Sequence, residues 1–216
     1  MRPDPCILAF DTSAAHCAAA LLSGGQVVAE AWEPMDKGQA ERLLPLCEEV
    51  LAARGLSWAD LDAVAVGTGP ANFTGIRIAV AAARGLALSL GIPAIGVTRL
   101  EALAEGLPRP LTVIEDARRG EVYVQEFDPD PEAARLSTQA MLPHEVGPLP
   151  LVGSAAGAAL AVVPGARLLE QPLPLHHAIA IIAARRFGTE QPRPSPFYLR
   201  GADAAPPSDP PPVILP

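Results

Sequence analysis

Aromatic residues are scarce in this sequence, and so are basic residues. Phe, Trp and Tyr make up only 4% of the 216 residues, while 50% of the residues are hydrophobic. A folded core therefore has to be built mainly from Ala, Val, Leu and Ile. Lys and Arg number 16 against 24 Asp and Glu, which gives a net charge of -8. Proteins that bind nucleic acid alone neutralise phosphates with clustered Lys and Arg, so we expect no RNA binding by this chain alone.

The sequence also lacks the patterns of secreted and membrane proteins. Its three cysteines, Cys6, Cys17 and Cys47, form no C-x-x-C pair, and we expect them to be reduced and buried. The first residues, MRPDPCILAF, are too short and too interrupted by proline for a signal peptide. We find no apolar run that approaches the roughly 18 residues needed to cross a membrane. We therefore expect a cytoplasmic protein without a membrane segment.

Hydrophobic periodicity in the first half predicts an α/β unit. Two of the strands are separated by a Gly-Gly turn, which is typical of a hairpin. Two others are continuous apolar runs, as in parallel sheets that are buried on both faces. The predicted order is strand, strand, strand, helix, strand, helix, strand and helix, at residues 6–10, 18–22, 27–32, 39–54, 62–67, 73–90, 92–97 and 99–106.

The second half begins like the first. Asp11 and Asp116 each close an apolar strand and precede a turn and a second strand. Such a pattern, repeated about a hundred residues apart, indicates an internal duplication. We predict an α/β fold with a first subdomain at residues 1–105 and a second, degenerate subdomain at 106–200. Residues 201–216 are rich in proline, and we predict a disordered tail there.

A glycine-rich loop, GTGPANFTG, joins the buried strand at 62–67 to the helix at 73–90. This layout is typical of a phosphate cradle, in which amides at a helix start bind an anion. However, the loop lacks the third glycine of G-x-G-x-x-G and the lysine of a P-loop. Asn72 or Thr74 would cap the helix, and Gly75 would allow a close approach. Two hypotheses stay open: a weak anion site, and a turn that only starts the helix.

Two acidic turns are further candidates for binding a metal–phosphate group. They are Asp11 with the hydroxyl groups that follow it, and Asp116 with Arg118 and Arg119. The same residue types are common in turns, where they bond their own backbone, and this alternative also stays open.

Motifs of catalysis and of metal binding are missing. None of the four histidines stands in an H-E-x-x-H pattern, and no G-x-S-x-G motif marks a hydrolase serine. We therefore predict no catalytic residue and no metal site. Only a weak ATP or ADP site with Mg²⁺ is considered, at Asp11, Thr12, Asn72, Thr74 and Gly75.

The helix at 73–90 is apolar almost all round. Its only strongly polar residues, Arg77 and Arg84, share one stripe. A sheet covers only one side of a helix, so the other side needs a second helix or another protein. A helix buried inside the domain is one explanation, and a protein interface, which we favour, is the other. The predicted interface residues are Leu43, Leu46, Val50, Ile76, Arg77, Val80 and Arg84.

Together these stretches resemble the motifs of the bacterial TsaB family, also called YeaZ. The resemblance covers roughly residues 6–200 and implies an actin-like, Hsp70-like (ASKHA) fold of two related subdomains. Its third and fifth stretches are specific to the family. In chain order, the stretches are ILAFDTS, QAERLLPL, GTGPANFTGIRIAVAAARGLAL, GIPAIGVTRLEALA, DARRGEVYVQEFD and PFYLR.

The resemblance also implies a function. TsaB proteins take part in modifying the adenosine beside the anticodon of tRNAs that decode ANN codons. In that machinery the TsaD subunit transfers the threonylcarbamoyl group, and TsaB pairs with TsaD and supports it together with the small ATPase TsaE. The implied partners are TsaD, TsaE in the assembled complex, or a second copy of the chain, with tRNA contacted only through the complex. The contact helices correspond to about residues 39–54 and 73–90.

The same resemblance argues against catalysis. Two metal-binding histidines of TsaD correspond here to Arg99 and Leu103, and neither can replace an imidazole. The sequence also departs from TsaB, because Gln39 stands where the family has His, and Ala71-Asn72 replace Gly-Ser. We expect a non-catalytic scaffold subunit. The alternatives are an ATP-hydrolysing enzyme of the same fold and a homodimer with an unrelated binding role.

Overall fold

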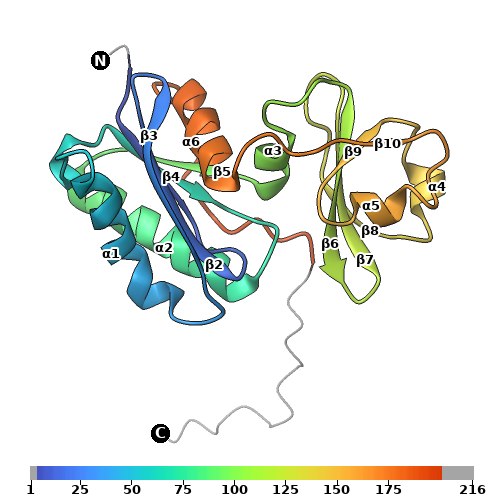
Figure 1. The fold of residues 1–216 in the computed structure, drawn as a ribbon, viewed down its shortest axis with the longest axis horizontal. Helices are drawn as coiled ribbons and strands as arrows, with labels where there is room; N and C mark the ends of the chain where they lie inside the picture. Colours follow the sequence, from blue (N-terminus) through green and yellow to red (C-terminus); the bar gives the residue numbers. More distant parts are fainter. Residues whose placement is uncertain (1–3, 201–216) are drawn as a thin grey trace, which may run out of the picture.

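The computed structural model describes residues 4–200, so the predicted tail at 201–216 lies outside the described residues. Within them the chain forms two five-stranded sheets, which Figure 1 shows as two halves side by side. Each half is a mixed sheet with helices against it, as an α/β fold requires.

The first sheet has the strand order β3-β2-β1-β4-β5. Its central strand, β1, pairs antiparallel with β2 and parallel with β4, and this confirms the predicted order of strands and helices. The elements are β1 (Ile7–Asp11), β2 (His16–Ser23), β3 (Gln26–Pro34), α1 (Gln39–Ala52), a 3-10 turn (Trp58–Asp60), β4 (Ala63–Gly67), α2 (Phe73–Leu90), β5 (Ala94–Val97) and α3 (Arg99–Ala104).

The second sheet repeats the first, with the order β10-β9-β6-β7-β8. Its central strand, β6, pairs antiparallel with β7 and parallel with β9, as β1 does with β2 and β4. The predicted internal duplication is thus confirmed. The elements are β6 (Leu111–Arg118), β7 (Glu121–Phe127), β8 (Arg135–Thr138), α4 (Leu142–Glu145), β9 (Pro150–Val152), α5 (Ala156–Ala159), β10 (Arg167–Leu168) and α6 (Leu175–Arg186).

The last helix of each unit packs on the sheet of the other unit. Leu100 of α3 lies in one apolar cluster with Val113 of the second sheet. Ile179 of α6 lies in one cluster with Ile7 of the first sheet, and Figure 1 shows α6 against that sheet. The predicted second subdomain at 106–200 is therefore corrected, because its final helix buries its apolar side on the first sheet.

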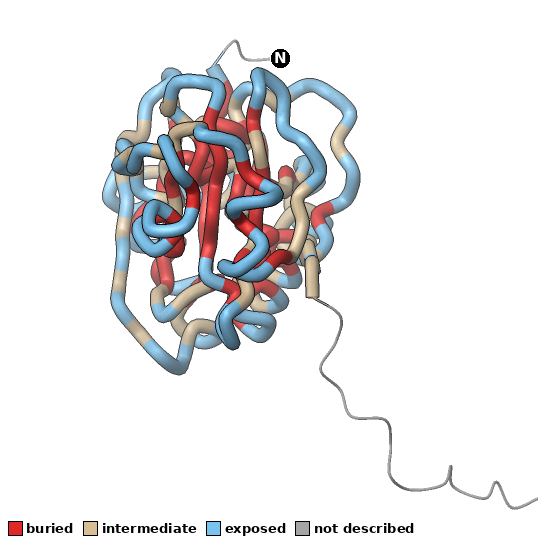
Figure 2. Tube along the Cα trace, turned by 90° about the vertical axis from the view of Figure 1, so that its right-hand side faces the viewer, coloured by how far each residue is buried: buried red, intermediate tan, exposed pale blue. Residues whose placement is uncertain are grey.

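Helices α1 and α2 cover the opposite face of the first sheet. Figure 2 shows the buried residues gathered along the strands and the inner sides of the helices. The five apolar residues predicted to contact a partner are all at most 2% exposed: Leu43, Leu46, Val50, Ile76 and Val80. Since these side chains lie in the core on their own sheet, they are not available to a partner. The predicted interface has to be corrected at these positions.

Helix α2 is long and apolar enough, by length and composition, to cross a membrane. This corrects the expectation that the sequence holds no such run. In the structure Ile76, Ala79 and Ala83 of this helix pack in the core of the first unit. The apolar inner side of α2 is therefore explained by its contact with the sheet.

Two glycines of α2 differ in what surrounds them. A Cβ at Gly75 would lie 1.9 Å from the carbonyl oxygen of Thr12, whereas a Cβ at Gly85 would meet no atom within 4 Å. We expect Gly75→Ala to lower the free energy of unfolding by about 1–3 kcal/mol, because α2 must move off the β1 turn. Gly85→Ala is the control and should raise it by up to about 1 kcal/mol, since Ala is the better helix former. Urea denaturation measures both, and equal losses would contradict this packing.

Two leucines of α1 test which side of the helix faces the sheet. Leu46 is 0% exposed and Leu44 is 42% exposed. We expect Leu46→Ala to lower the free energy of unfolding by about 2–5 kcal/mol, because it leaves a cavity in the core. Leu44→Ala should change it by less than about 0.5 kcal/mol. If thermal or urea denaturation finds the larger loss at Leu44, the side of α1 that carries Leu44 faces the sheet instead.

Candidate functional site

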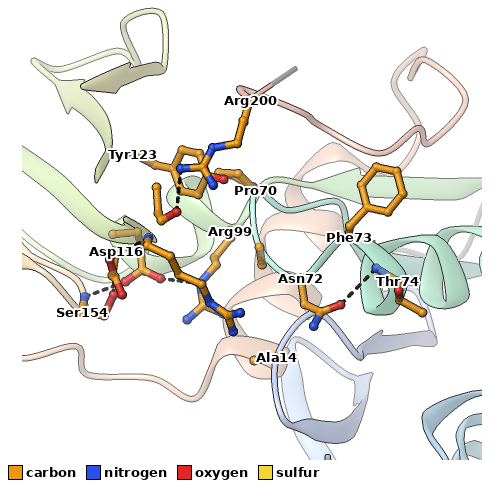
Figure 3. Close-up of a pocket in the computed structure, with 14 residues that line it drawn as sticks. Ala14, Pro70, Asn72, Phe73, Thr74, Arg99, Asp116, Tyr123, Ser154 and Arg200 are labelled. Atoms are coloured by element: carbon orange, nitrogen blue, oxygen red, sulfur yellow. Dashed lines mark hydrogen bonds and ion pairs between the residues drawn. The ribbon is translucent and has the colours of Figure 1, made fainter. Parts of the chain in front are cut away.

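A cleft of about 630 Å³ lies between the two units. Asn72, Phe73 and Thr74 line it from the start of α2, and Asp116 and Ser154 line it from the second unit. Figure 3 shows these side chains on facing sides, with Arg99 between them. The cleft is therefore the place where the loop before α2 and the second acidic turn come together.

The amides at the start of α2 already have a partner. Of the two predicted candidates, Asn72 and not Thr74 is the N-cap. Its Oδ1 accepts hydrogen bonds from the backbone N–H of Thr74 at 3.0 Å and of Gly75 at 3.1 Å. An anion at this helix start would have to compete with that side chain. These hydrogen bonds therefore support the second of the two hypotheses, that the loop is a turn which only starts the helix.

The close approach that Gly75 permits is taken up by the chain itself. Thr12 donates a hydrogen bond from Oγ1 to the carbonyl oxygen of Gly75 at 2.7 Å, and the Thr12 carbonyl lies where a Cβ of Gly75 would be. Thr12 is fully buried. Neither group is left to face a ligand in the cleft.

Asp11 is bound within its own turn. Its Oδ1 accepts the Ser13 hydroxyl hydrogen at 2.6 Å, its Oδ2 accepts the Ser13 backbone N–H at 3.0 Å, and His16 lies 3.8 Å away. Burial would raise the pKa of Asp11, but the interactions with His16 and Ser13 outweigh it and hold the pKa below its usual value. Asp11 is 1% exposed, so its carboxylate stabilises the turn and does not face the cleft.

An ion pair occupies the middle of the cleft. The Arg99 Nε donates to Glu115 Oε2 at 2.5 Å, and Glu115 Oε1 accepts the Ser154 backbone N–H at 2.6 Å. Burial lowers the pKa of Arg99, but the charge and hydrogen bond of Glu115 more than offset this, so the pKa is raised. Leu103, the other residue of this stretch considered above, is buried in the core. This pair links the two units.

Asp116 is the exposed acid of the cleft. Its Oδ1 accepts the backbone N–H of Arg118 at 2.8 Å, which is the bonding expected of a turn. Arg118 and Arg119 have positive φ angles of 62° and 55°, which is uncommon for residues other than glycine. The Asp116 backbone N–H is bonded to the Ser154 hydroxyl at 3.0 Å. The predicted turn is confirmed, and it presents one carboxylate to solvent.

The segment after α6 returns to α2, which no pattern in the sequence predicted. Tyr198 stacks on Phe73 with ring centroids 5.0 Å apart. Arg77 lies over the Phe73 ring, 3.6 Å from its centroid, and donates from Nε to the Tyr198 hydroxyl at 2.9 Å. Farther along, Arg200 donates to the Ala117 carbonyl oxygen at 2.9 Å. Arg77 therefore makes contacts inside this chain, and a substitution there would also disturb the packing of Phe73 and Tyr198.

The outer side of α2 faces solvent with apolar and small residues, together with the polar Arg77 and Ser89. Ala81, Gly85 and Leu88 are exposed, and Leu88 is 81% exposed. Leu44 of α1 is also exposed, and α1 lies beside α2 in Figure 1. We call these four residues the outer face. Arg84 is half-buried at its side. The outer face, and not the predicted inner residues, is the apolar part of these helices that is exposed to solvent.

Known proteins resemble this chain in sequence. The family model for TsaD, described as tRNA N6-adenosine threonylcarbamoyltransferase, matches residues 33–139. The Escherichia coli protein named tRNA threonylcarbamoyladenosine biosynthesis protein TsaB is 41% identical over 130 residues, which are 57% of this chain and 55% of that protein. An uncharacterized protein of Mycobacterium tuberculosis is 33% identical over 208 residues, 93% of this chain and 94% of that protein.

The fold is shared with a solved structure. YeaZ from Pseudomonas aeruginosa superposes with a TM-score of 0.72 at 28% identity, over 90% of this chain and 100% of that one. The sequence alignment with the Escherichia coli relative spans only about half of that relative, 55% of its length. The chain therefore shares its fold with YeaZ, and it belongs to the TsaB (YeaZ) family of tRNA threonylcarbamoyladenosine biosynthesis.

Proposed function

We propose that this protein is a non-catalytic subunit that pairs with the threonylcarbamoyltransferase TsaD and activates it. In this proposal TsaD transfers the threonylcarbamoyl group to the adenosine beside the anticodon of ANN-decoding tRNAs, and TsaE joins the assembled complex. The chain contacts tRNA only through that complex and works in the cytoplasm. In the absence of TsaD, two copies of the chain pair through the same surface to form a homodimer.

The observation that carries the proposal is the outer face of α1 and α2. Leu88 is exposed over 81% of its surface and Leu44 over 42%, and neither side chain is part of the buried core. Small residues at Ala81 and Gly85 allow another helix to approach α2 closely. Exposed apolar surface of this kind is typical of a protein interface.

The cleft supports the non-catalytic part of the proposal. A nucleotide with Mg²⁺ does not fit the residues present, because Asn72 holds the amides of Thr74 and Gly75, and Asp11 is buried in its turn. The Arg99–Glu115 pair lies between the two units. We propose that the subunit needs no nucleotide of its own in this cleft.

A charge on the outer face tests the pairing. We expect Leu88→Glu to weaken binding of TsaD from the same genome at least tenfold, about 1.4 kcal/mol, because a carboxylate would be desolvated in the contact. Since Leu88 is exposed, the free energy of unfolding should change by less than about 0.5 kcal/mol. Calorimetric titration and thermal denaturation measure the two effects.

Leu168→Glu is the matched control, because Leu168 is 49% exposed on β10 of the second sheet. It should bind TsaD like the unchanged chain. If Leu88→Glu also binds normally, the outer face is not the contact. If neither variant nor the unchanged chain binds TsaD, the pairing itself is wrong.

A second experiment tests the absence of catalysis. We expect the purified chain to hydrolyse ATP with Mg²⁺ no faster than the buffer alone, because the described carboxylates of the cleft are bound by neighbouring groups, apart from the outward side of Asp116. Asp116→Ala should therefore leave the rate unchanged. Turnover that disappears in Asp116→Ala would support the alternative, an ATP-hydrolysing enzyme of this fold.

A further inference from the structure

Three ligand-type side chains meet at the edge of the first sheet, away from the cleft. Glu30 lies on β3, the edge strand, and His176 and His177 lie in the first turn of α6. The Nε2 atoms of His176 and His177 lie 2.8 Å and 2.5 Å from the same oxygen, Oε2 of Glu30. The ligand atoms of all three residues lie within 4.8 Å of one another.

The direction of the two histidines is what distinguishes this cluster from a simple ion pair. Neighbouring residues in a helix project about 100° apart and do not normally face a common point. Here both imidazole rings turn toward one carboxylate oxygen, with their centroids 4.8 Å apart and their planes nearly perpendicular. One histidine would be enough to hold Glu30 against α6. Convergence of both rings is the arrangement by which a metal ion is chelated.

The donor set is that of a zinc-type cation. Two imidazole nitrogens and one carboxylate oxygen bind Zn²⁺ at about 2.0–2.2 Å, with water in a fourth position. Tetrahedral ligands at that distance lie about 3.3 Å apart, so the atoms now at 2.8 Å and 2.5 Å need to separate by less than about 1 Å. The Glu30 side chain is 50% exposed and free to make this movement.

The surroundings suit a cation. The start of a helix carries about half a positive charge, which opposes a cation, but the full negative charge of Glu30 lies closer to the site. The chain as a whole has a net charge of -8.

We propose that Glu30, His176 and His177 bind one divalent transition-metal ion of the Zn²⁺ class, which fastens α6 to the edge strand β3. The site was not expected from the sequence, because Glu30 and His176 are 146 residues apart and follow no local ligand motif. Since α6 is the helix that returns from the second unit to the first sheet, the ion would strengthen the link between the two halves. This proposal is independent of TsaD binding and of any activity.

The test uses untagged full-length protein, so that no added histidines bind the metal. After treatment with a chelator and exchange into metal-free buffer, ZnCl₂ is titrated by calorimetry, and the melting temperature is followed in parallel. We expect one Zn²⁺ per chain and, at a hundredfold excess over Kd, a rise in melting temperature of roughly 5–10 °C. Co²⁺ should give the visible absorption bands of a tetrahedral site with nitrogen and oxygen ligands.

Two variants at accessible ligands decide the assignment. Glu30→Gln keeps the shape and hydrogen-bonding capacity of the side chain, and His177→Ala removes a ring that is 19% exposed. Both should fold, bind Zn²⁺ at least tenfold more weakly and lose the rise in melting temperature. His144→Ala is the matched control, because His144 is an exposed histidine on α4 in the second unit, and it should bind like the unchanged chain.

Three results would overturn the proposal. The first is the absence of stoichiometric binding in the unchanged chain, which would make the cluster a hydrogen-bonded clasp between α6 and β3. The second is unchanged binding in both Glu30→Gln and His177→Ala, which would place the metal elsewhere. The third is an equal loss in His144→Ala, which would indicate unspecific binding to surface histidines.

Discussion

The contact between the β1 turn and the first turn of α2 constrains the rest of the molecule. Gly75 lies so close to Thr12 that no side chain fits between them, and the Thr12 hydroxyl bonds the Gly75 carbonyl. The Ser13 carbonyl in turn accepts the backbone N–H of Asn72. This contact fixes the direction in which α2 leaves the loop. It holds Asn72 where its side chain bonds the amides of Thr74 and Gly75, and the outer face of the same helix is turned to solvent.

The periodicity of the sequence was enough to predict the elements of the first unit and the duplication, because long amphipathic helices and apolar strands leave local patterns. The short elements of the second unit left no such pattern: α4, α5 and β10 have four, four and two residues. The packing of α6 on the first sheet was also missed. Its apolar residues show that it must be buried, but nothing local indicates which sheet covers it.

The candidate site shows the same limit. The sequence limited the cap of α2 to Asn72 or Thr74, of which the structure has Asn72, and it predicted correctly that Gly75 permits a close approach, because both depend on local backbone chemistry. What occupies that approach is Thr12, a residue of the turn that follows β1. The spacing of Leu43, Leu46 and Val50 identified the apolar side of α1, but spacing alone cannot distinguish a sheet of the same chain from a partner. The Arg99–Glu115 and Arg77–Tyr198 contacts depend on tertiary structure and have no sequence motif.

The duplication itself bears on the proposed pairing. The two units have equivalent strand orders, so α1 and α2 correspond to α4 and α5 by their places in the chain. The first pair has 14 and 18 residues, and the second pair has 4 and 4. The core uses α1 from Leu43 to Leu51, whereas α2 continues beyond Ala83, its last buried residue. Moreover, Leu88 near the end of α2 is exposed and adds little to folding. Exposed apolar side chains on a helix are costly to leave in water, and the proposed contact with a second protein would cover Leu88.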